Sequence, residues 1–221
     1  MTQTARTSTE SRTGERLVAV LVVILTVENG ELQVLLIKRS AEPYKDMYSL
    51  PGGRLEGDSL LDAATRRLEI ETGVKDVFLE QLYTFSDLDD GGAVAVAYWA
   101  LVDRESTTLA QRAEWQPAWC KTAELPQLAF HNDTVIEYAL TRLRNKLAYS
   151  NVAYSLLPKE FSLSQLQQTY EAILLRPLDK RNFRKRIVSL DVLEETGRSA
   201  SEGRHRPAKL YRFRERRPVV F

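Results

Sequence analysis

Residues 50–74 read LPGGRLEGDSLLDAATRRLEIETGV, a stretch that joins a glycine loop to a helical pattern. Residues 48–53, which end in Pro-Gly-Gly, contain too much Pro and Gly for a regular element, so we expect a loop there. From Leu60 to Thr72 the spacing predicts a helix, and Gly73 is the residue type that commonly ends one. The residues at helical spacing in this segment are Leu61, Ala64, Leu68 and Glu71.

Two apolar, β-branched runs precede this stretch. Leu17–Thr26 and Leu32–Arg39 are joined across Asn29-Gly30, a dipeptide that favours a tight hairpin turn. Further elements are expected downstream, with strands at 77–85 and 93–102 and a helix at 130–149. The first part of the chain is therefore predicted to be a domain of mixed α and β structure.

A different pattern begins after residues 150–161, where the apolar periodicity lapses. Ser162 and Gln165 form a capping-box pattern that opens a helix, and Asp179 is a favourable N-cap for a second one. Two strand-like pieces are expected near 192–194 and at 208–213, on either side of a Gly/Arg-rich turn at 197–207. Two helices followed by a β wing are typical of a winged helix.

The length of 221 residues suits one mid-sized domain and a small second one. We expect a mobile arm at 1–14, a first domain at 15–149 and a second at 150–221. Cys120 is the only cysteine, which excludes an internal disulfide and a Cys/His zinc site and favours a reducing cytoplasm. The apolar runs are too short to cross a bilayer, so no membrane anchor is expected.

Charge is distributed unevenly along the chain. Residues 176–221 contain fourteen Lys/Arg and six Asp/Glu, a net charge of +8 that leaves −7 for residues 1–175. A basic end on an acidic body indicates a polyanionic partner that only one domain contacts. The alternative is a solvated charged tail.

The stretch at 50–74 resembles the Nudix box, a Gly-Gly loop and a Glu followed by the helical pattern Arg-Glu-aliphatic-any-Glu-Glu-any-Gly. Family members hydrolyse nucleoside diphosphates linked to another group, so the resemblance implies a helix that faces a diphosphate. The best match pairs Asp58 with the first Glu, Arg66 with the Arg and Glu71 with the last Glu. Arg67 and Ile70 then stand in place of two carboxylates, which weakens attraction for a divalent metal. We therefore expect no efficient hydrolysis, no catalytic residues and no required cofactor.

A glycine loop without the full carboxylate cluster favours ligand binding without turnover. Backbone amides at glycines approach phosphate closely, and arginines add charge-assisted bonds. The predicted effector-binding residues are Arg39, Gly52, Gly53, Arg54, Asp58, Arg66 and Glu71. Arg67 is a further candidate for such a bond, whereas Arg66 has the alternative of pairing only with Glu71 within the helix.

Two other ligand contacts are open at this point. The aromatic candidates for stacking on a base are Tyr83, Phe85, Tyr98 and Trp99, although aromatics in such strands are more often part of the core. The carboxylates that leave a weak Mg²⁺ site open are Glu56, Asp58 and Glu71.

The segments 158–174, 178–187 and 204–211 closely resemble the C-terminal domain of the Nudix-related transcriptional regulators, the NrtR family. Together with the box, the resemblance covers about residues 15–215. It implies a Nudix-fold α/β/α sandwich with a mixed sheet, followed by a small α+β winged-helix domain. It also implies a homodimer, a repressor of NAD-metabolism or sugar-use genes, that senses ADP-ribose or a related phosphorylated ribose and binds paired half-sites of operator DNA.

The residues of the second domain agree with DNA binding on physical grounds. In the helix from Asp179, the spacing places Phe183, Ile187 and Leu190 inward and leaves a basic face for the major groove. The predicted DNA-binding residues are Lys180, Arg181, Asn182, Arg184 and Lys185 on this helix, and Arg204, Arg206 and Lys209 in the wing. The alternatives are a metal-dependent Nudix pyrophosphatase that acts on ADP-ribose-like nucleotide sugars, with the basic domain as an accessory, and an RNA-associated module, which fits the order of elements less well.

Overall fold

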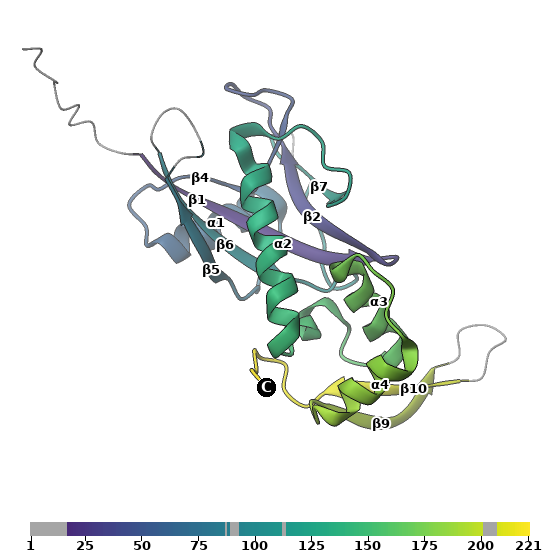
Figure 1. Cartoon of the computed structure of the whole chain (residues 1–221). Coiled ribbons are helices and arrows are strands. Elements are labelled where there is room, and N and C mark those ends of the chain that lie inside the picture. The colour runs from purple at the N-terminus through teal and green to yellow at the C-terminus, as the bar shows by residue number, and fades with distance from the viewer. Residues whose placement is uncertain (1–16, 87, 89–92, 112–113, 201–206) are drawn as a thin grey trace, which may run out of the picture.

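The computed structural model describes residues 17–86, 88, 93–111, 114–200 and 207–221. The arm expected at 1–14 and the wing residues Arg204 and Arg206 lie outside these ranges. Within them, seven strands form one mixed sheet and three more form a second, smaller sheet (Figure 1). No helix of these ranges is long and apolar enough to cross a membrane.

The large sheet starts with the predicted hairpin. Its strands β1 (Val18–Glu28) and β2 (Glu31–Lys38) meet at Asn29 and Gly30, whose φ angles of 52° and 77° suit the tight turn. The strand order β3-β2-β1-β6-β5 is antiparallel except between β1 and β6. The other strands are β3 (Tyr48–Ser49), β4 (Gly52–Arg54), β5 (Glu80–Phe85), β6 (Val94–Leu101) and β7 (Gln116–Lys121).

Helices α1 (Leu60–Thr72) and α2 (Asn132–Tyr149) cover opposite faces of this sheet (Figure 1). A short 3₁₀ turn, η1 (Ala129–His131), precedes α2. Alternate side chains of β1 point to opposite faces of the sheet, since Val22 packs in the cluster under α1 and Val23 in the cluster under α2. The α/β/α sandwich expected from the sequence is therefore confirmed.

Helix α1 has the predicted bounds because both of its ends are capped. The Ser59 side chain accepts a hydrogen bond from the backbone N–H of Asp62, and Gly73 ends the helix at φ 80° with its N–H on the Glu69 carbonyl. Of the residues noted at helical spacing, Ala64, Leu68 and Glu71 are buried, whereas Leu61 is 46% exposed.

The structure corrects two expectations about the sheet. The Pro-Gly-Gly loop contains the short strands β3 and β4, because β4 pairs with residues 19–21 of β1. Strand β7 was not predicted, and it pairs with β2 along its whole length although its second residue is Pro117. A proline is tolerated there because β7 lies at an edge and pairs with β2 alone.

The second domain has the predicted winged-helix order. Its elements are η2 (Val152–Leu156), β8 (Phe161–Ser162), α3 (Leu163–Leu174), α4 (Lys180–Ser189), β9 (Leu193–Ala200) and β10 (Ala208–Phe213). Ser162 and Gln165 form the expected capping box, and Asp179 caps α4. Where we expected a turn from Gly197, β9 continues to Ala200, because its pairing with β10 extends to Ala208.

The two domains share one hydrophobic cluster. It runs from the α2 face of the sheet through Leu143 and Leu147 to Phe161, Ile173 and Phe213 of the winged helix. Two arginine side chains reinforce this contact at the C-terminal half of α2. Arg144 donates from Nε to the Ile173 carbonyl (3.1 Å), and Arg186 of α4 donates to the Ala148 carbonyl (3.3 Å).

The C-terminal segment 214–221 runs from β10 back to the end of α2 (Figure 1). It is held by Asn151, whose buried amide donates to the carbonyls of Glu215 (3.2 Å) and Arg217 (3.0 Å). The Asn151 Oδ1 accepts from the backbone N–H of Val219 (2.8 Å). A single side chain thus joins the domain junction to the end of the winged helix.

Replacement of Asn151 with Ala should destabilise the protein by about 2–3 kcal/mol, because three part-buried hydrogen bonds of about 1 kcal/mol each are lost. The expected fall in melting temperature is roughly 4–12 °C. Thermal unfolding followed by circular dichroism measures this fall. The matched control is Asn145→Ala at an exposed position of α2, and an equal effect of both changes would contradict the role of Asn151.

Candidate functional site

A pocket of about 210 Å³ lies between the sheet and the N-terminal end of α2. Four of the predicted effector-binding residues line it, namely Arg39, Gly52, Gly53 and Arg54. Arg39 follows the end of β2, and the other three form β4, which we call the glycine strand. The pairing of β4 with β1 brings the glycine strand beside Arg39. The pocket is therefore lined by two glycines, which have no side chains, and by two arginines, and guanidinium groups are the groups that can bind an anion there.

Phe130 forms one wall of the pocket, and sequence reasoning missed it. The Arg39 guanidinium lies over its ring at 4.7 Å from the centroid, and the Tyr44 ring meets it edge-on at 4.8 Å. Phe130 and His131 have φ angles of 56° and 48°, a left-handed conformation that non-glycine residues rarely adopt and that clusters at functional sites.

Asn132 was missed as well. Its side chain is fully buried, and its Oδ1 accepts a hydrogen bond from the backbone N–H of Leu50 at 2.8 Å. This bond fixes the residue before the Pro-Gly-Gly segment to the first residue of α2. The sequence AFHND at 129–133 gives no local signal that Phe130 forms a pocket wall or that Asn132 bonds to Leu50, since both roles depend on tertiary contacts.

The aromatic residues proposed for stacking lie elsewhere. Phe85, Tyr98 and Trp99 are buried in the core, and Tyr83 stacks on Tyr138 with ring centroids 4.8 Å apart. None of these four lines the pocket, which leaves Phe130 as its aromatic wall.

Glu71 lies behind the glycine strand. The Gly52 N–H donates to its Oε2 at 2.8 Å, and its side chain is buried. Burial raises the pKa of Glu71 from 4.5 to about 7, although the Gly52 hydrogen bond and the charges of Arg67 and Arg39 act in the opposite direction. The carboxyl thus ties α1 to the strand that lines the pocket.

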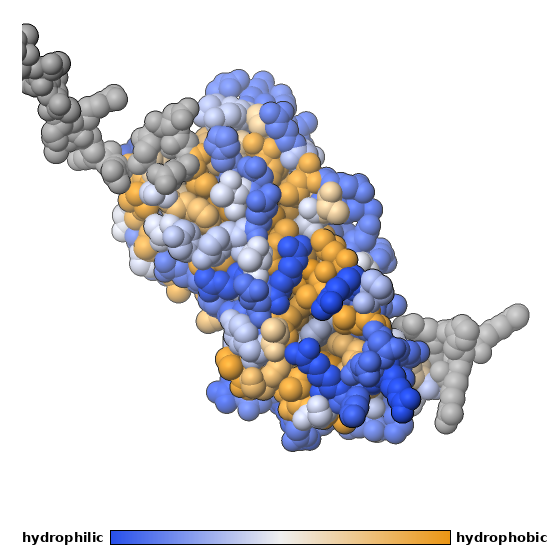
Figure 2. Space-filling model, in the orientation of Figure 1, coloured by the Kyte–Doolittle hydropathy of each residue, from blue (hydrophilic) through white to orange (hydrophobic). Residues whose placement is uncertain are grey.

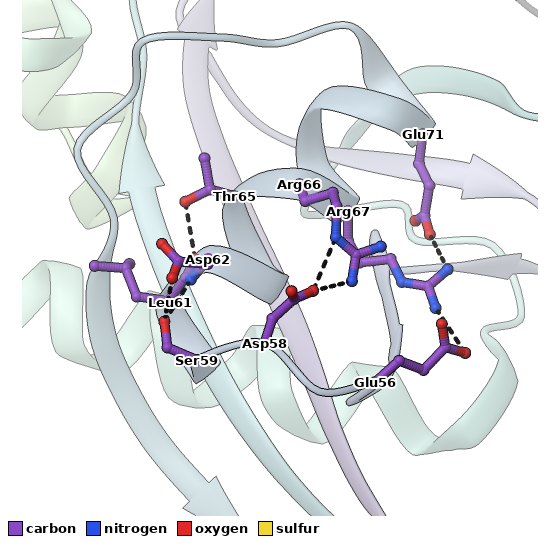
Figure 3. Close-up of polar contacts among 9 residues, drawn as sticks. All are labelled: Glu56, Asp58, Ser59, Leu61, Asp62, Thr65, Arg66, Arg67 and Glu71. Atoms are coloured by element: carbon purple, nitrogen blue, oxygen red, sulfur yellow. Dashed lines mark hydrogen bonds and ion pairs between the residues drawn. The ribbon is translucent and has the colours of Figure 1, made fainter.

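The two arginines of α1 have different partners (Figure 3). Arg66 pairs with Asp58 at the surface, so the alternative that Arg66 pairs with Glu71 is wrong. Arg67 lies between Glu71 (Nη1 to Oε1, 3.6 Å) and Glu56 (Nη2 to Oε1, 3.8 Å). Arg67 and Glu71 are four residues apart, so they lie on the same face of the helix, which favours this pair.

Helix α4 presents the predicted basic face to solvent. Phe183 and Ile187 are buried and Leu190 is half-buried, whereas the five predicted DNA-facing residues are exposed. These are Lys180, Arg181, Asn182, Arg184 and Lys185. Figure 2 shows hydrophilic residues over the end of the molecule where α4 lies.

The charges of α4 differ from those of the wing in their partners. Among the described residues, no ion pair involves Lys180, Arg181, Arg184 or Lys185. In the wing, Lys209 pairs with Glu195 at 2.7 Å, and this contact raises the pKa of the lysine. Uncompensated positive charge is thus concentrated on the helix.

Comparison with known proteins identifies both domains. The Nudix domain model matches residues 15–139, and the model of the NrtR DNA-binding winged helix domain matches residues 153–213. The ADPR responsive transcriptional repressor NtrR of Acinetobacter baylyi is 37% identical over 207 residues, which cover 89% of this chain and 82% of that protein. The chain belongs to the NrtR family of Nudix-related transcriptional regulators.

Solved structures of the NrtR family agree. NrtR of Shewanella oneidensis complexed with a 27mer DNA is 33% identical, covers 89% of this chain and 93% of its own, and superposes with a TM-score of 0.77. The NUDIX domain of the same protein complexed with ADP ribose is 32% identical, covers 59% of this chain and 90% of its own, and gives a TM-score of 0.53.

The Nudix fold implies a divalent metal, and the carboxylates of this NrtR family member do not fit one. Glu71 is committed to Gly52 and faces Arg67, while Asp58 is committed to Arg66. In the described parts of the chain, no group of three or more His, Cys, Asp or Glu residues is placed to hold a metal ion. A guanidinium instead occupies the space between Glu56 and Glu71.

The raised pKa of Glu71 predicts how stability depends on pH. Between its ordinary pKa of 4.5 and the folded value of about 7, the folded state binds more protons than the unfolded chain. Stability from this group is therefore present at low pH and is lost as pH rises to about 7, by about 3 kcal/mol.

Glu71→Gln does not titrate, so its melting temperature should fall less between pH 5 and pH 8 than that of the wild type. Thermal melts of both proteins at the two pH values measure the difference. Glu69→Gln, at an exposed carboxylate of the same helix, is the control and should behave as the wild type does. Parallel pH profiles for wild type and Glu71→Gln would contradict this origin of the pH dependence.

Proposed function

We propose that this chain is a transcriptional repressor that binds operator DNA through its winged helix as a homodimer in the cytoplasm and senses ADP-ribose or a related phosphorylated ribose through its Nudix domain. The observation that carries the proposal is the row of cations on α4 without ion pairs, in a chain whose other domain contains a pocket lined by Arg39 and Arg54. The named relatives support it, since one is an ADPR responsive repressor and another was crystallised with DNA.

The DNA interface follows from residue chemistry. Arg184 and its neighbours can donate to guanine edges in the major groove, and Asn182 has the paired donor and acceptor that recognise adenine. Phosphate contacts are the role we propose for Lys209 of β10 and for the predicted wing residues Arg204 and Arg206, the last two of which lie outside the described ranges. Genes of NAD metabolism or sugar use are the proposed targets, as the family resemblance implies.

The effector site extends beyond the pocket. A volume of about 210 Å³ is below the usual range of about 300–1,000 Å³ for a whole ligand site, so the pocket accommodates one end of ADP-ribose. The diphosphate would then lie along Gly52, Gly53 and Arg54, with Arg39 over the pocket. Glu71 positions this strand, and Arg66 of α1 pairs with Asp58 of the preceding loop at the surface.

We propose further that the chain binds its effector without efficient hydrolysis and requires no metal. Arg67 and Ile70 stand at positions where the Nudix pattern has carboxylates, and Glu71 is held by Gly52. Incubation with ADP-ribose and excess Mg²⁺ tests the rival assignment as a pyrophosphatase. Stoichiometric binding with no release of AMP supports a sensor, whereas multiple turnovers would establish an enzyme.

Arg184→Ala should weaken binding to operator DNA by roughly 5- to 150-fold, the effect expected when a side chain that contacts a base edge is lost. Fluorescence anisotropy with duplex from the gene's own neighbourhood, at fixed salt, measures the change. Arg104→Ala removes the same charge from the first domain and should alter affinity less than twofold. Equal losses in both variants would contradict a specific role for α4.

ADP-ribose should release the DNA, and Arg39→Ala should abolish this release while DNA affinity without effector stays within twofold of wild type. The reason is that Arg39 lines the pocket and is far in sequence from the winged helix. The same anisotropy assay with increasing ADP-ribose gives both quantities. If ADP-ribose released DNA from Arg39→Ala as it does from the wild type, Arg39 would not be part of the effector site.

A further inference from the structure

Helix α4 has one apolar side chain on its exposed face. Of its three apolar residues, Phe183 and Ile187 are buried, whereas Val188 is 61% exposed. Among the described residues, Val188 belongs to neither of the two hydrophobic clusters. As a β-branched residue it also lowers helix propensity slightly. The fold of the single chain therefore gives Val188 no packing role.

The position of Val188 along α4 places it among the basic residues. Arg181, Arg184, Lys185 and Val188 stand at i, i+3, i+4 and i+7, so the four side chains share one face of the helix, and all four are exposed. The three cations form no ion pair with any described residue. Helices that lie along the major groove contact bases with this same spacing. Val188 is thus the fourth member of the face that we propose to enter the groove.

The chemistry of the groove limits what a valine can contact there. Phosphates and most base-edge groups require a charge or a hydrogen bond, and an isopropyl group provides neither. The 5-methyl group of thymine is the apolar group that the major groove displays. Seven residues separate Arg181 from Val188, which corresponds to about 10 Å along the helix axis and about three base-pair steps of B-DNA.

We propose that Val188 contacts the 5-methyl group of a thymine in the operator, about three base pairs from the position that Arg181 contacts. The inference rests on the proposed function and adds to it one residue that determines sequence specificity, together with the base that it selects. Because the side chain has no charge and no donor, its contribution is selectivity for a methylated base and not salt-dependent affinity.

Fluorescence anisotropy at fixed salt tests the proposal with the full-length protein and the duplex from the gene's own neighbourhood. In a series of duplexes, each thymine in turn is replaced by deoxyuridine, which lacks only the 5-methyl group. The wild type should lose roughly three- to fivefold in affinity at one thymine of each half-site, the effect of one methyl contact. Val188→Ala should bind the unmodified duplex more weakly by a similar factor and show no further loss at that thymine, because the two changes remove the same contact.

Two further variants control for the loss of a valine as such. Val220→Ala is the matched control, since it shortens a valine that is 72% exposed and lies outside α4, and its profile over the duplex series should match that of the wild type. Val188→Thr keeps one of the two methyl groups and should retain part of the sensitivity to the same thymine.

The outcomes separate this inference from the proposed function. A wild-type profile in which no thymine methyl affects binding, or a Val188→Ala protein as sensitive as the wild type at the same thymine, would overturn the role of Val188 and leave the repressor intact. Equal wild-type affinity for this duplex and a scrambled one would overturn operator recognition itself, and the role of Val188 with it. Circular dichroism checks the fold of each variant, and Val188→Thr carries the test if Val188→Ala does not fold.

Discussion

The hydrogen bond from the Gly52 N–H to Glu71 is the contact on which the first domain depends. It joins α1 to β4 at the point where β4 approaches β1 so closely that a Cβ on Gly52 would lie 2.2 Å from the Val20 carbonyl oxygen. Only glycine permits both this approach and the φ of 151° at that position. The position of β4, whose glycines line the pocket, therefore depends on two things: the missing side chain of Gly52 and its hydrogen bond to the buried carboxyl of Glu71.

Helix α2 connects this site to the DNA-binding domain. Its first residue, Asn132, holds the backbone before the glycine strand, and its 18 residues span about 27 Å to the domain junction. There Arg186 of α4 bonds to the Ala148 carbonyl, and Asn151 holds the C-terminal segment. Helix α2 thus contacts both the pocket and α4, the helix that we propose to face DNA. It can therefore couple the two sites if the effector binds two arrangements of the domains unequally, which is what such a switch requires.

Features set by local chemistry were predictable from the sequence, and features set by tertiary contacts were not. The Asn29-Gly30 hairpin, the end of α1 at Gly73 and the Ser162 capping box depend on neighbouring residues, and they occur as expected. Strand β7 has no local signal, because its pairing with β2 supplies the missing preference. Phe130 belongs to the same class, since its contacts with Arg39 and Tyr44 come from a distant part of the chain.

The candidate site shows the same division at the level of side chains. Helical periodicity places Arg66 and Arg67 about 100° apart, but it does not say which of them meets a carboxylate from the preceding loop. The course of residues 55–59 decides this, by bringing Asp58 to Arg66 and Glu56 to Arg67. A one-residue difference along α1 therefore separates a solvated ion pair from a cation fixed behind the pocket. The chemistry of the site depends on that loop as much as on the helix that resembles the Nudix box.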